Sequence, residues 1–167
     1  KVKVTIDGDN AEVDMTGSAD QVPTAFNVPF EGSTKVACYY AFRALLLDTY
    51  THDEYVPQNE GSFRPIAVTA PLGSIFNPEF PFAAEARFAQ IQRIVDCIIK
   101  ALAPVLPKSI TAGNSATLSF AAYSGMRDSG DMWVFIEVNE GSYGGRPASD
   151  GPDSIDCLMA NTRNNPI

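Results

Sequence analysis

Alternating apolar and polar residues at the start of the chain predict a β-hairpin. Every second residue from 2 to 6 is apolar, and the same period returns from 11 to 15. A period of two places one side of each strand against a core. Gly8 and Asp9 lie between the two stretches and suit a tight turn, which also accounts for Asp7 and Asp9 without a bound cation.

Two later stretches carry apolar residues at helical spacing. The first helix is expected to begin at an N-cap supplied by Ser33 or Thr34 and to end near Asp48. The second is expected over residues 83–103, with Pro104 ending it. The core-facing residues expected in the first helix are Val36, Tyr40 and Leu47, flanked by Ala37, Ala41 and Ala44. Those expected in the second are Phe88, Ile91, Ile94, Val95, Ile98, Ile99 and Leu102. The polar residues expected to face solvent or a partner on this helix are Glu85, Arg87, Gln90, Gln92, Arg93 and Lys100.

The remaining segments are predicted to be connections and short strands. Residues 18–29 and 49–65 contain prolines and lack a sustained period, so both are expected to be loops. Residues 66–70 predict a short strand, and 73–78 a second extended piece that ends in a turn. Residues 117–138 predict another hairpin, with its turn near Gly125 to Asp131.

The length and composition are those of one soluble globular domain. The chain has 167 residues, of which 45% are hydrophobic and 19% charged. We therefore expect a single α+β domain over residues 1–167, made of antiparallel hairpins packed with two main helices. The net charge of −8 argues against binding to nucleic acid or to an anionic membrane through a general basic field. No apolar run reaches the roughly 18 residues that span a bilayer.

Cysteine usage points to a reducing compartment. Cys38, Cys97 and Cys157 are odd in number, widely spaced and set among apolar neighbours, as is typical of buried free thiols. We therefore expect a cytoplasmic protein. A catalytic cysteine or serine would depend on the single histidine, His52, which lies in a polar stretch with no nucleophile elbow nearby.

Candidate chemistry is concentrated in Gly141–Asn164, GSYGGRPASDGPDSIDCLMANTRN. The stretch combines glycines with carboxylate, guanidinium and amide groups and has little apolar surface. Two interpretations remain open: a ligand site, or an irregular loop whose polar side chains bond to their own backbone. The candidate catalytic residues are Arg146, Asp150, Asp153, Asn161, Arg163 and Asn164. We expect Arg146 or Arg163 to hold an anionic group, and Asp150 or Asp153 to orient a partner group.

The carboxylates of this stretch do not predict a metal site within the chain. Asp150, Asp153 and Asp156 recur every three residues, whereas a calcium-binding loop needs oxygen ligands at alternate positions and a late glutamate. A zinc site would need paired Cys and His ligands, which the sequence lacks. A phosphate could instead be cradled by the backbone N–H groups of Gly144 and Gly145 beside Arg146, although the Walker pattern is absent.

Several motifs, in order along the chain, resemble the hydantoinase B/oxoprolinase family, the B-type subunits of N-methylhydantoinases, 5-oxoprolinases and acetone or acetophenone carboxylases. The matching pieces are VDMTGS followed by Gln21, Asn27 and Pro29; YYAFR at 39–43; GSFRPI at 61–66; PLGSIFNP at 71–78; QRIVD at 92–96; GGRPASDG; and NTRNNP. The chain begins without methionine, inside a predicted strand. We therefore expect a central to C-terminal fragment of a larger B-type subunit.

The resemblance implies part of an ATP-dependent enzyme that hydrolyses cyclic amides. An A-type, ATP-binding subunit or domain would phosphorylate the amide or carbonyl oxygen, and the B-type part would help to open the ring. ATP and a divalent metal are expected in the parent complex, and neither is expected to be held by this fragment, which is expected to be inactive alone. The family's histidines before the final Asn-Thr-Arg-Asn are replaced here, where Asp156 and Leu158 stand.

Two alternatives to ring hydrolysis remain open. The first keeps the family but makes the parent complex an ATP-dependent ketone carboxylase, with a small ketone in place of a cyclic amide. The second makes the segment a non-catalytic assembly domain, whose polar stretch forms an interface between subunits.

Overall fold

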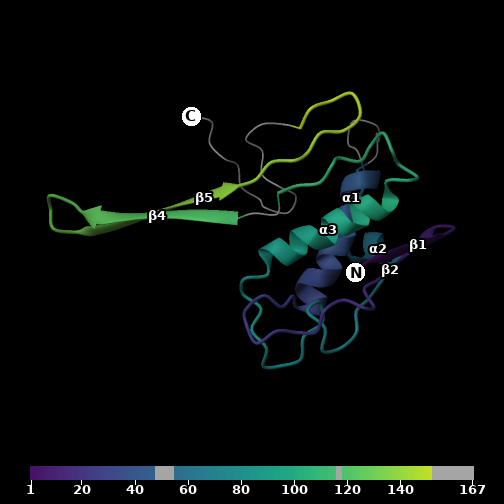
Figure 1. Ribbon diagram of the computed structural model, residues 1–167, viewed down its shortest axis with the longest axis horizontal. Helices are drawn as coiled ribbons and strands as arrows, with labels where there is room; N and C mark the ends of the chain where they lie inside the picture. Colours follow the sequence, from purple (N-terminus) through teal and green to yellow (C-terminus); the bar gives the residue numbers. More distant parts are fainter. Residues whose placement is uncertain (48–54, 116–117, 152–167) are drawn as a thin grey trace.

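The computed structural model describes residues 1–47, 55–115 and 118–151. Figure 1 shows a compact body of helices and a small sheet, from which a long hairpin projects. The expected α+β class and two main helices are confirmed. In the part of the chain that the structure describes, no helix is both long and apolar enough to cross a bilayer.

The predicted N-terminal hairpin forms one side of a three-stranded sheet. Strands β1 (Lys3–Asp7) and β2 (Asn10–Asp14) pair antiparallel, with Val4 opposite Val13. Strand β3 (Ile66–Thr69) then pairs with β2 in the parallel direction, so the sheet is mixed and the expectation of antiparallel pairs alone was wrong. Parallel pairing requires a long crossover, here the chain between β2 and β3, and a local hydrophobic pattern carries no information about it.

The first main helix begins earlier than predicted. One turn of π-helix, η1 (Phe30–Thr34), runs directly into α1 (Lys35–Leu46), so Ser33 and Thr34 lie inside helical structure and neither side chain caps it. The hydroxyl of the fully buried Thr34 instead donates to the Phe76 carbonyl at 2.8 Å. This bond ties the helix start to the 71–78 segment.

The buried face of α1 is rotated from the predicted one. Ala37, Cys38, Ala41 and Phe42 face the core, whereas Val36 is 44% exposed. The cause is the similar hydrophobicity of neighbouring positions in VACYYAF, which leaves the choice of face to the partner elements.

Helix α3 (Phe88–Leu102) packs against α1 and β1, and its apolar stripe from Ile91 to Leu102 is buried. It begins about one turn later than the predicted residue 83, so Phe88 at its start is half exposed. Gln92, expected at the surface, is 4% exposed, because it lies beside Ile91 on the broad buried face of the helix. The central buried residues of the shared core are Val13, Met15, Cys38, Ile94, Val95 and Ile98.

The predicted connections are mostly irregular, as expected, with two differences. A short helix, α2 (Glu60–Phe63), follows Asn59, whose side chain accepts from the Ser62 N–H. Residues 73–78 form isolated bridges and turns rather than a strand. The 18–29 loop is held by the buried Asn27, whose amide group bonds the backbone of residues 22, 24 and 83.

The second predicted hairpin is confirmed and is longer than expected. Strands β4 (Leu118–Met126) and β5 (Met132–Glu140) pair along their full length, and the turn between them is closed by the Arg127 N–H donating to the Asp131 carbonyl at 2.8 Å. In Figure 1 the hairpin extends away from both helices and from the three-stranded sheet.

Candidate functional site

The glycine-rich segment after β5 is held against the loop that follows α3. The Gly144 N–H donates to the Gly113 carbonyl at 2.6 Å, and the Ala112 N–H donates to the Gly145 carbonyl at 2.8 Å. These bonds form a short backbone ladder between two segments that lie about thirty positions apart in the sequence. The ladder fixes where the segment from 142 to 146 lies relative to α3.

A tight turn follows this ladder and sets the position of Arg146. The backbone groups of Arg146 and Ser149 bond to each other in both directions, at 2.9 and 3.0 Å. Pro147 and Ala148 lie between them, and Ala148 has a φ of 64°. A proline followed by a positive φ is the pattern of a type II turn, where glycine is usual at the second of these positions, so Ala148 is strained.

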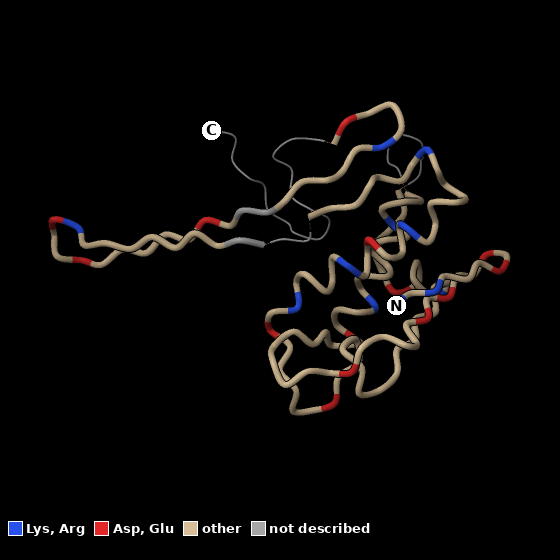
Figure 2. The backbone as a smooth tube through the Cα atoms, viewed as in Figure 1, with Lys and Arg blue, Asp and Glu red and all other residues tan. Residues whose placement is uncertain are grey.

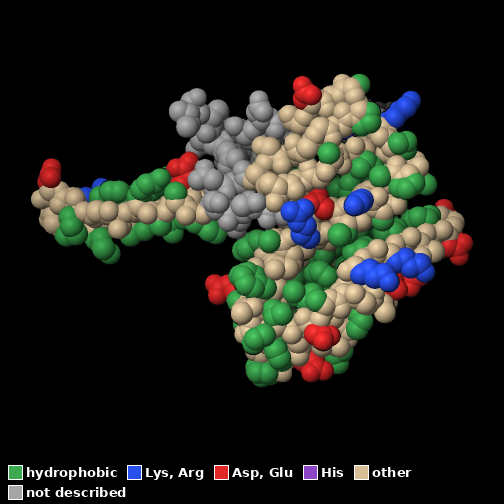
Figure 3. Space-filling model, viewed as in Figure 1, with side chains coloured by type: hydrophobic (Ala, Val, Ile, Leu, Met, Phe, Trp, Pro, Cys, Tyr) green, Lys and Arg blue, Asp and Glu red, His purple; other side chains and the backbone are tan. Residues whose placement is uncertain are grey.

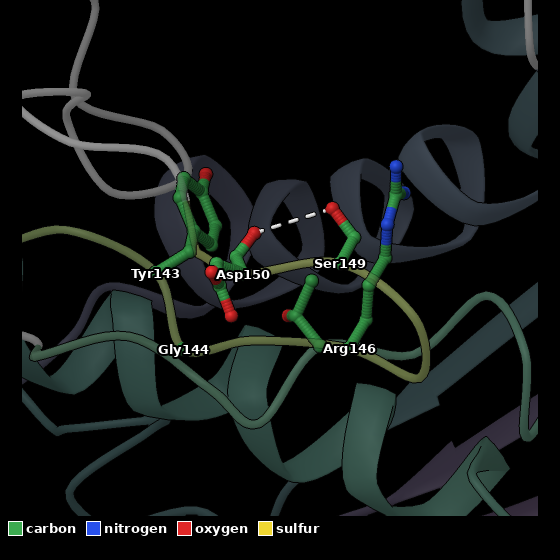
Figure 4. Close-up of a pocket in the computed structure, with 6 residues that line it drawn as sticks. Tyr143, Gly144, Arg146, Ser149 and Asp150 are labelled. Atoms are coloured by element: carbon green, nitrogen blue, oxygen red, sulfur yellow. Dashed lines mark hydrogen bonds between the residues drawn. The ribbon is translucent and has the colours of Figure 1, made fainter.

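The turn forms one wall of a hollow of about 510 Å³. Its lining residues are Thr111, Tyr143, Gly144, Arg146, Ser149 and Asp150. In Figure 4 the Arg146 guanidinium and the Asp150 carboxylate point to different sides, and the Ser149 hydroxyl donates to the Asp150 backbone carbonyl at 3.3 Å. The hollow therefore offers a cation and an anion at separate places, rather than two groups converging on one atom.

The structure thus brings together Arg146 and Asp150 among the predicted site residues. The other candidates, Asp153, Asn161, Arg163 and Asn164, lie outside the described residues. The same is true of His52, Asp156 and Cys157, so the proposed roles of all these residues stay predictions.

The expected phosphate cradle is only partly available. The Gly144 N–H is engaged by the Gly113 carbonyl and cannot also bind an anion. A side chain at Gly144 would meet Ala112 at 2.7 Å, so glycine here serves the close approach of two backbone segments. The prediction that this N–H is free for a ligand was wrong, because the ladder partner lies far away in the sequence.

Sequence reasoning missed a polar cluster that supports the ladder from α3. The Asp96 carboxylate accepts from the Asn114 amide at 2.9 Å and from the Arg93 guanidinium at 3.0 Å. Arg93 also donates to the Ser115 carbonyl at 3.3 Å. The three side chains join α3 to the loop whose Ala112 and Gly113 form the ladder.

Burial raises the pKa of Asp96, and this effect outweighs the positive charge of Arg93 and the hydrogen bonds from Asn114 and Arg93, which lower it. A second hollow, of about 410 Å³, lies beside this cluster and shares Thr111 with the first. The only sequence signal for the cluster was the spacing of Arg93 and Asp96 on one helix face, which by itself describes an ordinary surface ion pair.

The described residues do not supply a complete site for a metal ion or a nucleotide. Among residues 1–47, 55–115 and 118–151, no group of three or more His, Cys, Asp or Glu side chains converges. With the Gly144 N–H also engaged, these residues do not fit a phosphate cradle by themselves, and we derive no step through either group.

Comparison with known proteins gives a family match along the whole chain. The family model described as Hydantoinase B/oxoprolinase matches residues 1–167. The B-type subunit of a D-/L-hydantoinase from Pseudomonas sp. (strain NS671) is 42% identical over 99% of this chain, which spans 28% of that protein. A 5-oxoprolinase of Pestalotiopsis fici is 30% identical over 98% of the chain, which spans 12% of that protein.

Among solved structures, an ATP-dependent caprolactamase from Pseudomonas jessenii has a similar fold. The TM-score is 0.66 at 22% sequence identity, with 90% of this chain and 26% of that chain covered. The chain therefore spans less than a third of the length of each of these three proteins.

Proposed function

The chain belongs to the hydantoinase B/oxoprolinase family, and on that premise we propose that it is part of a larger B-type subunit of an ATP-dependent enzyme that opens cyclic amides. The partner in this proposal is an A-type, ATP-binding subunit or domain. Free Cys38 and Cys97 suit a reducing compartment, and we place the enzyme in the cytoplasm.

The observation that carries the proposal is the likeness to the B-type subunit of the D-/L-hydantoinase, at 42% identity over 99% of the chain. The fold shared with a caprolactamase supports it, since that enzyme is ATP-dependent and its name refers to a cyclic amide. A cyclic amide is a poor electrophile, and phosphorylation of its oxygen would create a better leaving group. Such chemistry explains why ring opening would need ATP.

In this proposal the residues of the chain bind and orient rather than transfer the phosphoryl group. Arg146 is exposed in the 510 Å³ hollow and pairs with no carboxylate among the described residues, so its guanidinium is available to an anionic group. Asp150 lines the same hollow and orients a donor of the substrate or of the partner subunit. Asp153, Asn161, Arg163 and Asn164 complete the proposed set.

The test is Arg146→Ala in the complete complex, with ATP hydrolysis measured in the presence of a lactam or a hydantoin. Loss of a charged hydrogen bond predicts a fall in kcat/KM of about 10- to 100-fold while the complex stays assembled. Arg127→Ala, at the turn of the β4–β5 hairpin, is the matched control and is expected to keep its rate. Unchanged turnover in Arg146→Ala would remove this residue from the site.

The same assay separates the proposal from its two alternatives. ATP hydrolysis that requires a ketone and bicarbonate, and ignores cyclic amides, would replace ring opening by ketone carboxylation. Failure of Arg146→Ala to assemble, with a normal rate in whatever complex forms, would favour the assembly domain.

A further inference from the structure

The β4–β5 hairpin carries an apolar face that the described protein leaves uncovered. Cross-strand partners in an antiparallel pair share a face, and alternate residues along each strand do so too. The large side chains on one such face are Phe120, Met126, Met132, Val134 and Ile136, and their exposed fractions range from 57% to 71%. We call these five residues the open face.

The opposite face of the hairpin partly covers itself. Trp133 lies over Gly125, where an added Cβ would meet its ring at 2.9 Å. Tyr123 and Phe135 stack with their ring centroids 6.3 Å apart. Phe120, the one aromatic residue of the open face, stacks on no other ring among the described residues. The open face is therefore the face that still needs a cover.

Charge is concentrated away from the open face. Figure 2 shows charged residues at the tip of the hairpin, where Arg127, Asp128 and Asp131 lie, and Figure 3 shows hydrophobic side chains along its length. All five residues of the open face are uncharged. Covering this face would therefore desolvate no charged group, while the tip could stay in water.

Size distinguishes between the possible occupants. A stable contact between separate proteins uses roughly 20–30 residues on each side, and the open face supplies five large side chains. A two-fold contact between two copies through this face would fall well short of that. A segment of the same polypeptide needs no such area, because covalent connection gives it a high effective concentration.

The relatives show that such a segment has room to exist. The chain spans 28% of the B-type hydantoinase relative and 26% of the caprolactamase chain, so most of each protein lies outside the matched region. An isolated two-stranded hairpin is marginally stable in water, and packing against further structure is the usual remedy.

We propose that the open face docks onto an apolar surface in the remainder of the B-type subunit, outside residues 1–167. This inference rests on the proposed function in so far as that function places the chain in a longer subunit. Since β5 leads directly into Gly141 and the Arg146 turn, the docked remainder would also lie close to the candidate site.

The experiment is thiol labelling of Val134→Cys in two proteins, the 167-residue chain and the complete B-type subunit without its A-type partner. Cys97→Ser and Cys157→Ser remove background labelling, and the buried Cys38 is kept. We expect labelling in the complete subunit to be slower by about tenfold or more, because only transiently opened molecules would react. Ser129→Cys, at the exposed tip, is the control and is expected to react equally in both proteins.

Each other outcome overturns the proposal. Equal labelling of Val134→Cys in both proteins would show that the face stays open. Protection that appears only after the A-type subunit is added would assign the face to that partner, and protection lost on dilution would assign it to a second copy.

Labelling needs no substrate, so its result is independent of the reaction. Protection of Val134→Cys in a complex that hydrolyses no ATP with any cyclic amide would remove the proposed activity and leave the docking intact. An active complex with unprotected Val134→Cys would do the reverse.

Discussion

Single buried polar residues hold the irregular parts of this chain in place. Asn27 is fully buried in a loop, yet its amide bonds the backbone on both sides of that loop and the carbonyl of Ala83. Thr34 does the same between η1 and Phe76. Their burial could not be predicted from residue type, since asparagine and threonine are usually exposed and their partners here lie 42 to 56 residues away.

Cys38 provides a prediction at the scale of one residue. Burial raises the pKa of its thiol from 9.0 to about 12. The folded state therefore keeps the proton while the unfolded chain loses it, so this residue's contribution to stability is complete below pH 9 and declines as the pH rises toward 12. Between these values the free energy of unfolding is expected to fall by up to about 1.4 kcal/mol per pH unit because of Cys38.

The measurement is urea unfolding at several pH values for the original chain and for Cys38→Ala. Other groups also titrate in this range, but they are common to both proteins, so the difference between the two curves isolates the thiol. Parallel curves between pH 9 and 11 would contradict the assigned cause.

At the scale of elements, the sequence predicted which segments are helices better than it predicted how they are joined. The stripe from Ile91 to Leu102 is strong enough to define both the helix and its buried face. In α1 several adjacent apolar residues compete, and contact with α3 decided that Ala37, Cys38 and Ala41 turn inward. The start at Phe30 followed from packing rather than from a capping residue.

The contact between α3 and the ladder gives a prediction at this scale. Asp96→Ala removes the acceptor of both the Asn114 and the Arg93 hydrogen bonds. We expect it to lower the free energy of unfolding by about 1–3 kcal/mol, mainly through the part-buried Asn114 bond, because the Arg93 side chain is more than half exposed. Asp128→Ala, at the hairpin tip, is the control and is expected to have little effect.

Hydrogen exchange separates local from general destabilisation. If Asp96 holds the loop, the amides of Ala112 and Gly144 exchange faster in Asp96→Ala than the amides at the centre of α3 do. Equal acceleration at all these amides, or none, would show that Asp96 does not support the ladder.

At the scale of the whole molecule, the compact body and the hairpin are energetically separate. β4 and β5 contact each other along their full length, whereas the extensive contacts among the other described elements join β1, β2, β3, η1, α1 and α3. The shared core includes no residue of the hairpin among its buried members. The body therefore does not depend on the hairpin for its packing.

Replacing residues 119–139 by Asn-Gly tests this separation. Leu118 and Glu140 are paired across the two strands, so a two-residue turn can connect them. We expect cooperative thermal unfolding of the shortened chain with a Tm within about 4 °C of the original, which corresponds to a change of about 1 kcal/mol or less. Loss of cooperative unfolding would show that the hairpin is part of the folding unit.

The sequence by itself determined the two hairpins, the amphipathic α3 and the family, because short-range periodicity and ordered motifs are properties of the chain. It also singled out Arg146 and Asp150, whose residue types suit ligand binding. Only the tertiary structure decided the parallel β2–β3 pairing, the engagement of the Gly144 N–H and the Asp96 cluster. Each of these joins groups that are distant along the chain, and no local pattern specifies such a meeting.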